Sequence, residues 1–230
     1  SSEISALYNE ANEAIVSANA NAGFSIVKFE KQLSSSVAEK IPHGLSAAPN
    51  MILLKRTDGA EDWYVYHTST GLNKTTRLNS TAAVANATYL WGTVNDTVFN
   101  PAYTSTSPIT NIAYCFKSID GFSKFGSYTG TGAAGNLIET GFEPSFIMFK
   151  RTDSTGGWLI FDNKRNLTNP RNSRLEANNT GAEQAGSTSK FVDFYSNGFE
   201  PQVSDSEINA SGGTYIYMAF AADPDTEAPT

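Results

Sequence analysis

The chain has 230 residues, of which 40% are hydrophobic and 17% are charged, whereas soluble globular chains carry about 25% charged residues. The formal net charge of −7 excludes a broadly basic surface, so we expect no nucleic acid among the partners. No apolar run approaches the roughly 18 residues that a bilayer-spanning helix needs, and we expect no membrane insertion.

The first predicted element is an amphipathic helix from Ser2 to about Ala20. Ile4 and Tyr8 would share one face, because residues four apart lie on the same side of a helix. Ser2 is a suitable N-cap. We interpret residues 1–22 as this helix, forming the end of a preceding module or a linker.

From residue 23 onward the hydrophobic pattern is that of strands, and one pattern occurs twice. The stretches 48–66 and 143–161 share a proline, the word Lys-Arg-Thr-Asp and a tryptophan, all at one constant offset. In each stretch an apolar run, a turn that contains glycine and a second run predict a β-hairpin. Shorter runs bring each copy to about six or seven strands, a number typical of a β-sandwich.

We therefore predict an all-β protein of two tandem antiparallel β-sandwich modules with one short N-terminal helix. The modules are residues 23–121 and residues 122–222, and residues 223–230 form an acidic, proline-containing linker or tail. That composition is too polar to pack. We expect the chain to be a piece of a longer protein.

The repeated Lys-Arg-Thr-Asp word and the tryptophan after it allow two interpretations. In the functional one, tryptophan stacks on a sugar while arginine and aspartate hydrogen-bond to it. In the structural one, aspartate caps the turn and arginine lies over the cross-strand ring. Because the word recurs in two otherwise diverged copies, the structural interpretation is favoured.

Candidates for ligand binding are aromatic and polar residues that occur in one copy only. Trp91, Tyr64 and His67 are the candidate ligand-binding residues, because exposed rings can stack on sugars. Trp158 is a further ring that could stack.

Two acidic stretches are candidate metal sites. Asp58, Glu61 and Asp62 crowd one loop and could offer oxygen ligands to Ca²⁺. Asp205 and Glu207 form a sparser pair. Neither stretch has the alternating spacing of an EF-hand loop, so solvated turns are the competing interpretation.

No catalytic motif emerges from the sequence. There is no Gly-x-Ser-x-Gly elbow, and the stretch Gly130–Gly135 reads Gly-x-Gly-x-x-Gly without the helix pattern that a nucleotide-binding loop needs. Cys115 is the single cysteine, which excludes an intrachain disulfide framework and predicts a buried thiol. We expect no catalytic residues and no cofactor, Ca²⁺ being the one ion that the loop acids would suit.

Three segments, Gly126–Gly130, Phe146–Asp153 and Asn209–Ala221, resemble a duplicated domain of unknown function from tail-fibre and other virion proteins of marine bacteriophages. The resemblance covers about residues 23–222. The segment Ser2–Asn9 is similar to the closing part of laminin-G-like (concanavalin A-like) lectin modules, which often precede this domain. The family brings no catalytic residues.

The resemblance implies a non-catalytic structural and adhesive module of a phage tail fibre or similar appendage, located on the virion surface. The expected partners are other virion proteins, further copies of the chain (a homo-oligomer such as a trimer) and host-surface glycan. A carbohydrate-binding, lectin-like module is the alternative, and a polysaccharide depolymerase is a third. Buried tryptophans would weaken the lectin interpretation, and a depolymerase needs two carboxylates about 5–9.5 Å apart.

Overall fold

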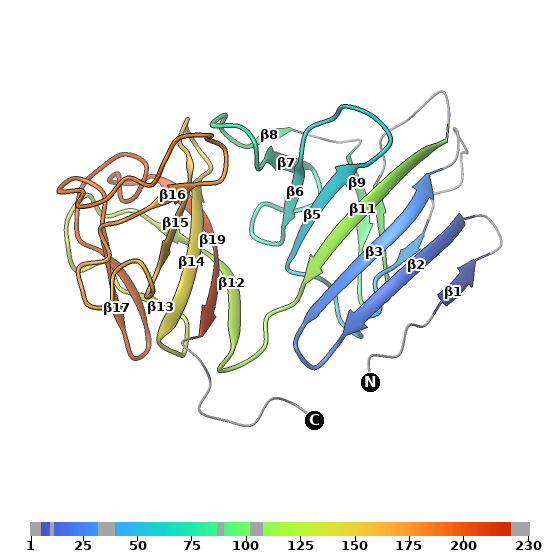
Figure 1. Ribbon diagram of the computed structural model, residues 1–230, viewed down its shortest axis with the longest axis horizontal. Helices are drawn as coiled ribbons and strands as arrows, with labels where there is room; N and C mark the ends of the chain where they lie inside the picture. Colours follow the sequence, from blue (N-terminus) through green and yellow to red (C-terminus); the bar gives the residue numbers. More distant parts are fainter. Residues whose placement is uncertain (1–5, 10–11, 32–39, 87–89, 102–107, 222–230) are drawn as a thin grey trace. The chain divides into compact units, whose positions relative to one another are not determined.

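The computed structural model describes residues 6–9, 12–31, 40–86, 90–101 and 108–221, and these form strands and turns with no helix among them (Figure 1). The expected all-β class is thereby confirmed. Within these ranges no helix is long and apolar enough to cross a membrane. The chain divides into two compact units: unit 1 comprises Ser1–Leu78 and Ala85–Ser118, and unit 2 comprises Asn79–Val84 and Ile119–Thr230.

Unit 1 contains two antiparallel sheets that face a common core. The larger sheet has the strand order β1-β2-β3-β11-β5-β6-β7-β8, and the smaller one has the order β4-β10-β9. The strands are β1 (Ala6–Asn9), β2 (Asn12–Asn19), β3 (Phe24–Lys31), β4 (Ile41–Pro42), β5 (Met51–Arg56), β6 (Tyr64–His67), β7 (Lys74–Arg77), β8 (Ala85–Asn86), β9 (Trp91–Val94), β10 (Val98–Pro101) and β11 (Ile109–Phe116).

Unit 2 is built in the same way. Its larger sheet has the order β12-β19-β14-β15-β16 and its smaller sheet the order β13-β18-β17. The strands are β12 (Ser123–Thr129), β13 (Ile138–Glu139), β14 (Pro144–Arg151), β15 (Trp158–Asp162), β16 (Leu175–Glu176), β17 (Val192–Tyr195), β18 (Gly198–Pro201) and β19 (Thr214–Ala221).

The two units share one strand order. Read across the larger sheets, the order β3-β11-β5-β6-β7 corresponds to β12-β19-β14-β15-β16. Read across the smaller sheets, β4-β10-β9 corresponds to β13-β18-β17. In both units the last long strand lies between two earlier strands of the larger sheet: β11 is hydrogen-bonded to β3 and β5, and β19 is hydrogen-bonded to β12 and β14. Unit 1 adds β1, β2 and β8 to this shared arrangement.

The expected N-terminal helix is wrong for the described residues of that segment, which form β1 and β2. Ala14 and Val16 are buried whereas Ile15 between them is 54% exposed, the alternation of a strand. Ala14 pairs with Phe29 of β3 and Val16 with Val27. The same apolar residues fit both periods, and pairing with β3 selects the strand. Residues 1–5, where the predicted helix would begin, lie outside the described ranges.

Each unit encloses its own hydrophobic core, which draws side chains from both sheets. In unit 1, Phe29 of the larger sheet packs edge-on against Phe99 of the smaller sheet, with 5.7 Å between ring centroids. In unit 2, Phe149 and Phe199 come from opposite sheets and are stacked nearly parallel, with 6.4 Å between ring centroids. Buried apolar area of this kind supplies most of the stability of a sandwich. Cys115 is fully buried in the unit 1 core, and burial raises the pKa of its thiol to about 12.

Candidate functional site

In unit 1 the Lys-Arg-Thr-Asp word lies at the end of β5 and forms a corner with β11. Arg56 Nε donates to Asp58 Oδ1 at 2.6 Å, and the backbone N–H of Thr110 donates to Asp58 Oδ2 at 3.1 Å. The backbone N–H of Thr57 returns a hydrogen bond to the Thr110 carbonyl at 2.8 Å. The hydrogen bond from Arg56 lowers the pKa of Asp58. This aspartate therefore fixes a turn.

Unit 2 repeats the corner with β19. Arg151 Nε donates to Asp153 Oδ1 at 3.0 Å, the backbone N–H of Thr214 donates to the same oxygen at 3.0 Å, and the backbone N–H of Thr152 donates to the Thr214 carbonyl at 2.8 Å. The Arg151 hydrogen bond is the main reason that the pKa of Asp153 falls to about 2. The structural role predicted for the aspartate holds in both units.

The lysine of the word also has one role in both units, which is to bind the carbonyl of the following turn. Lys55 Nζ donates to the Glu61 carbonyl, and Lys150 Nζ donates to the Gly156 carbonyl at 2.6 Å. Lys150 donates further to the Thr81 carbonyl at 3.1 Å. It is completely buried, and this burial lowers its pKa to about 8.

The three candidate metal ligands of unit 1 each have a separate partner. Asp58 is held by the corner just described, and Glu61 Oε1 accepts a hydrogen bond from the Tyr64 hydroxyl at 2.8 Å. Asp62 Oδ2 lies 2.7 Å from Arg77 Nε. Within the described ranges no three His, Cys, Asp or Glu side chains are grouped to hold a metal ion. The loop therefore does not turn its carboxylates toward one point.

We expect added Ca²⁺ or EDTA to leave the thermal midpoint of unfolding unchanged within about 1 °C. Ion binding to the native state raises stability by mass action, and Asp58 and Asp62 are already neutralised by arginines. Differential scanning calorimetry in 5 mM Ca²⁺ and in EDTA checks this, with Mg²⁺ as the control for ionic strength. A midpoint several degrees higher in Ca²⁺ alone would reinstate the metal site.

The three candidate ligand-binding residues of unit 1 do not form an exposed platform. Trp91 is 1% exposed and lies in the core, 5.6 Å from the ring of Tyr66. His67 is also 1% exposed. Tyr64 is half-buried, and the guanidinium of Arg77 covers its ring at 5.7 Å. Trp91 therefore presents no ring face on which a sugar could stack, and His67 is too buried in this structure to contact a ligand. Residue types alone do not separate a core tryptophan from an exposed one.

His67 instead closes the turn after β6, as Asp162 does after β15. The backbone N–H of Ser69 donates to His67 Nδ1 at 3.2 Å. In unit 2, the backbone N–H groups of Lys164 and Arg165 donate to Asp162 Oδ1 at 3.0 and 2.8 Å. Both side chains accept from the residue two positions on, which is a local turn cap. Trp158, the remaining candidate ring, is 1% exposed.

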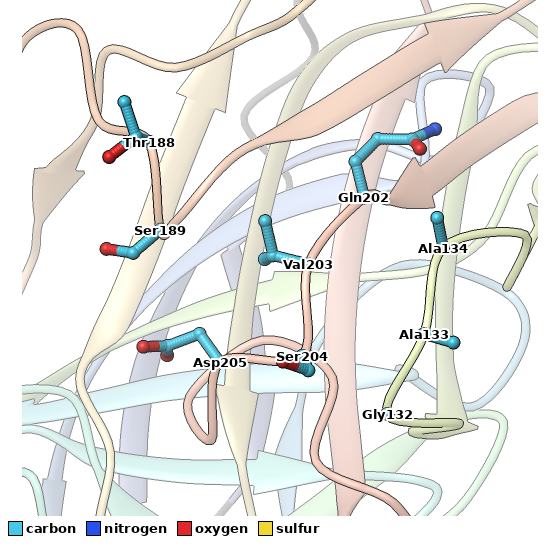
Figure 2. A pocket seen from close by; sticks show the side chains of 9 residues that line it. All are labelled: Gly132, Ala133, Ala134, Thr188, Ser189, Gln202, Val203, Ser204 and Asp205. Atoms are coloured by element: carbon cyan, nitrogen blue, oxygen red, sulfur yellow. The ribbon is translucent and has the colours of Figure 1, made fainter.

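A hollow of about 570 Å³ in unit 2 is a candidate site (Figure 2). It brings together two stretches that are far apart in the sequence, the Gly130–Gly135 loop and the loop of Asp205. A third loop, which contains Thr188 and Ser189, faces them across the hollow in Figure 2. The lining residues are Gly132, Ala133, Ala134, Thr188, Ser189, Gln202, Val203, Ser204 and Asp205.

Two of these walls are joined by one buried side chain, Asn209. Its Nδ2 donates to the carbonyls of Ala133 at 2.7 Å and of Val203 at 3.0 Å, one from each wall. Its Oδ1 accepts from the Thr131 backbone N–H and from Asn136 Nδ2, both at 2.9 Å. Asn209 is 0% exposed. Because all of its polar capacity is used, it fixes the separation of the two walls.

A glycine is required where the first wall approaches the backbone of Asn209 and Ala210, which follows the second wall in the sequence. A Cβ on Gly130 would lie 2.2 Å from the Ala210 carbonyl oxygen, which is backbone and cannot move aside. Gly132 has a φ of +76°, a conformation that side chains disfavour. These glycines therefore serve close packing of two loops, which agrees with the rejection of a nucleotide-binding loop.

Within this hollow the Gln202 amide donates to Glu200 Oε1 at 2.7 Å, whereas the hydroxyl side chains are uncommitted. No hydrogen bond within the described part of the chain engages the hydroxyls of Thr188, Ser189 or Ser204, which are exposed. Asp205 uses one oxygen to accept the backbone N–H of Glu207 at 2.9 Å and pairs with no described cation. Glu207, by contrast, is engaged by Lys190 and by the Gly157 backbone. Asp205 is thus the one carboxylate of the lining that can accept a ligand.

Sequence reasoning missed most of this hollow. Asn209 reads as an ordinary loop asparagine, and Thr188 and Ser189 lie in a stretch of small polar residues without any pattern. The signals that the sequence offers are the Gly130–Gly135 stretch and the acid at Asp205, and nothing in the sequence connects them. Their distance in the sequence is bridged by strand pairing between β12 and β19.

No curated protein and no solved structure matches this chain. A family match spans residues 6–224, which includes both units and every residue of the hollow. The chain belongs to the family described as a domain of unknown function, DUF7483.

Proposed function

We propose that this chain is a non-catalytic structural and adhesive module of a bacteriophage virion appendage, such as a tail fibre. The observation that carries the proposal is the use of reactive side chains as structural supports. Hydrogen bonds within turns engage Lys150, Arg151 and Asp153, and their counterparts in unit 1 are engaged in the same way. The virion setting is supported by three sequence segments, in β12, in β14 and around β19, that resemble a domain of bacteriophage virion proteins.

We infer that the two units descend from one module by duplication. The shared strand order and the matching corner hydrogen bonds at Asp58 and Asp153 support this inference. Tandem modules suit a rod that places a binding surface away from a particle. The similarity of Ser2–Asn9 to the end of a laminin-G-like module stays a prediction.

An adhesive module should bind without cleaving. Two hollows of unit 2 that lie in described residues each carry a single carboxylate, Asp205 in one and Asp162 in the other. Asp162 Oδ2 is paired with Arg165 Nη2 at 2.5 Å. Retaining and inverting hydrolysis both require two carboxyl groups that face one bond, so the depolymerase is the weaker proposal.

The test is the location of the chain and the fate of a bound polysaccharide. Mass spectrometry of purified particles should find the chain, and labelled antibodies should mark a projection from them. Incubation with bacterial polysaccharides should release no new reducing ends. A chain absent from particles contradicts the virion role, and new reducing ends contradict the non-catalytic role. Light scattering would give the number of copies in the assembly.

A further inference from the structure

We propose that the hollow formed by the Gly130–Gly135 loop, the Thr188–Ser189 loop and the Gln202–Asp205 loop binds one neutral saccharide unit directly. We call it the Asp205 hollow. The inference rests on the proposed adhesive function and adds to it the place of contact and the class of ligand. It also moves the site from unit 1, where Trp91 and His67 are buried, to unit 2.

The chemistry of the lining suits adjacent hydroxyl groups. A carboxylate oxygen accepts two hydrogen bonds, and serine and threonine hydroxyls both donate and accept. The free oxygen of Asp205 and the hydroxyls of Thr188, Ser189 and Ser204 therefore offer a mixed set of donors and acceptors. Hydrogen bonds to an ionised group are the stronger ones. A sugar with two neighbouring hydroxyls can satisfy this set.

The small side chains of the first wall allow a ring to approach closely. Gly132, Ala133 and Ala134 form that side of the hollow (Figure 2), where larger side chains would fill the space. The other wall contributes one apolar contact, Val203. The volume of about 570 Å³ is within the usual range for small-ligand sites. Binding here does not need an aromatic platform.

Charge selects against acidic sugars. Asp205 is the only charged residue of the lining, and none of the described cations neutralises it. A sialylated or sulfated unit would bring a second negative charge into the hollow, which costs free energy. The ligand class is therefore a neutral hexose or N-acetylhexosamine unit of a surface polysaccharide.

Two of the loops that line the Asp205 hollow are preorganised by hydrogen bonds, as expected for a binding site. Asn209 joins the Gly130–Gly135 loop to the Gln202–Asp205 loop by three hydrogen bonds of 3.0 Å or less. The Asp205 carbonyl accepts the backbone N–H of Asn209 at 2.8 Å. The loops are thus held before a ligand arrives, so little conformational entropy is lost on binding.

The decisive variant is Asp205→Asn. The asparagine oxygen can still accept the Glu207 N–H, so the turn is kept, while the free carboxylate oxygen becomes an amide donor. On an array of neutral, sialylated and sulfated oligosaccharides, the wild-type chain should bind neutral members and Asp205→Asn should bind them about tenfold or more weakly. Ser189→Ala should give a smaller loss. Glu183→Gln, which removes an exposed acid outside the lining, is the matched control and should bind like the wild type.

The outcomes separate the site from the function. Equal binding by Asp205→Asn and wild type, with unchanged thermal midpoints, would overturn the Asp205 hollow and leave the adhesive function standing. A preference for sialylated or sulfated members would overturn the site as well. If the wild-type chain binds no member of the array, both the adhesive role and the hollow fail. The virion location would then stand or fall on the particle measurements alone.

Discussion

Replacement of Trp91 by alanine is expected to lower the free energy of unfolding by about 3–5 kcal/mol, the usual cost of removing a large buried ring. Trp91 is 1% exposed in the unit 1 core, and Phe99 and Tyr66 belong to the same cluster. Urea denaturation followed by circular dichroism measures the loss.

Trp63→Ala is the matched control, because its ring is half-buried and stacks on Tyr114 at 6.2 Å. It should cost less than half as much as Trp91→Ala. Equal losses would contradict the placement of Trp91 at the centre of the core. Since Trp91→Ala removes core packing, any loss of sugar binding in this variant would report unfolding and not a lost contact.

The stability of the wild-type chain relative to Lys150→Met is expected to rise by about 3 kcal/mol between pH 7 and pH 10.5. The folded pKa of Lys150 is about 8 because the side chain is buried, against an ordinary value of 10.5. Between these two values the unfolded chain binds more protons than the folded one. Folding therefore becomes more favourable as the pH rises through this window, and a methionine cannot contribute this dependence.

Unfolding free energies from urea titrations at half-unit pH steps would show the effect as a difference curve. Lys124→Met removes one positive charge from an exposed position of β12 and corrects for the change in net charge. Difference curves of the same slope for both variants would show that burial of the Lys150 amine has no linkage to folding. Lys150→Met also leaves the Gly156 and Thr81 carbonyls without their donor, which should lower stability at every pH.

The sequence was sufficient to predict the all-β class and a structural role for the aspartate of the repeated word. The word is informative because Asp58 and Asp153 act locally, within two residues of the arginines that they bind. Turn chemistry of this range is visible in a linear sequence. The pairing of each aspartate with the first residues of β11 or β19 is a long-range contact that the repeat did not indicate.

The expected N-terminal helix and the expected exposure of Trp91 fail for one physical reason: tertiary packing decides which residues are buried. Ala14, Ile15 and Ala18 fit a helical face as well as they fit a strand, and only the edge of β3 selects between these. Trp91 was interpreted as a binding residue because unit 2 has no tryptophan there. Strand β17 begins at the same place in unit 2 with Val192, which is also buried. A difference between copies thus marks a change in core packing as readily as a change in function.

The candidate site was still harder to predict, because its parts lie on three loops that are distant in the sequence. Asn209 acts through backbone carbonyls of Ala133 and Val203, and a contact with backbone leaves no trace in the identity of the partner residue. The uncommitted state of Asp205 is likewise a property of what surrounds it. Composition shows how many acids there are but not which of them lack a cation.

The position of β11 and β19 between earlier strands of their sheets has a consequence for the order in which the chain acquires structure. In unit 2, β12 and β14 each hydrogen-bond to β19, yet β19 is the last of the described strands to be synthesised. The larger sheet cannot close on a ribosome until residues 214–221 have left the exit tunnel. The larger sheet of unit 1 can close earlier, once residues 109–116, which form β11, have left the exit tunnel. Each unit should therefore fold in one late step, with its apolar strand waiting for a partner, and aggregation would be most severe in that interval.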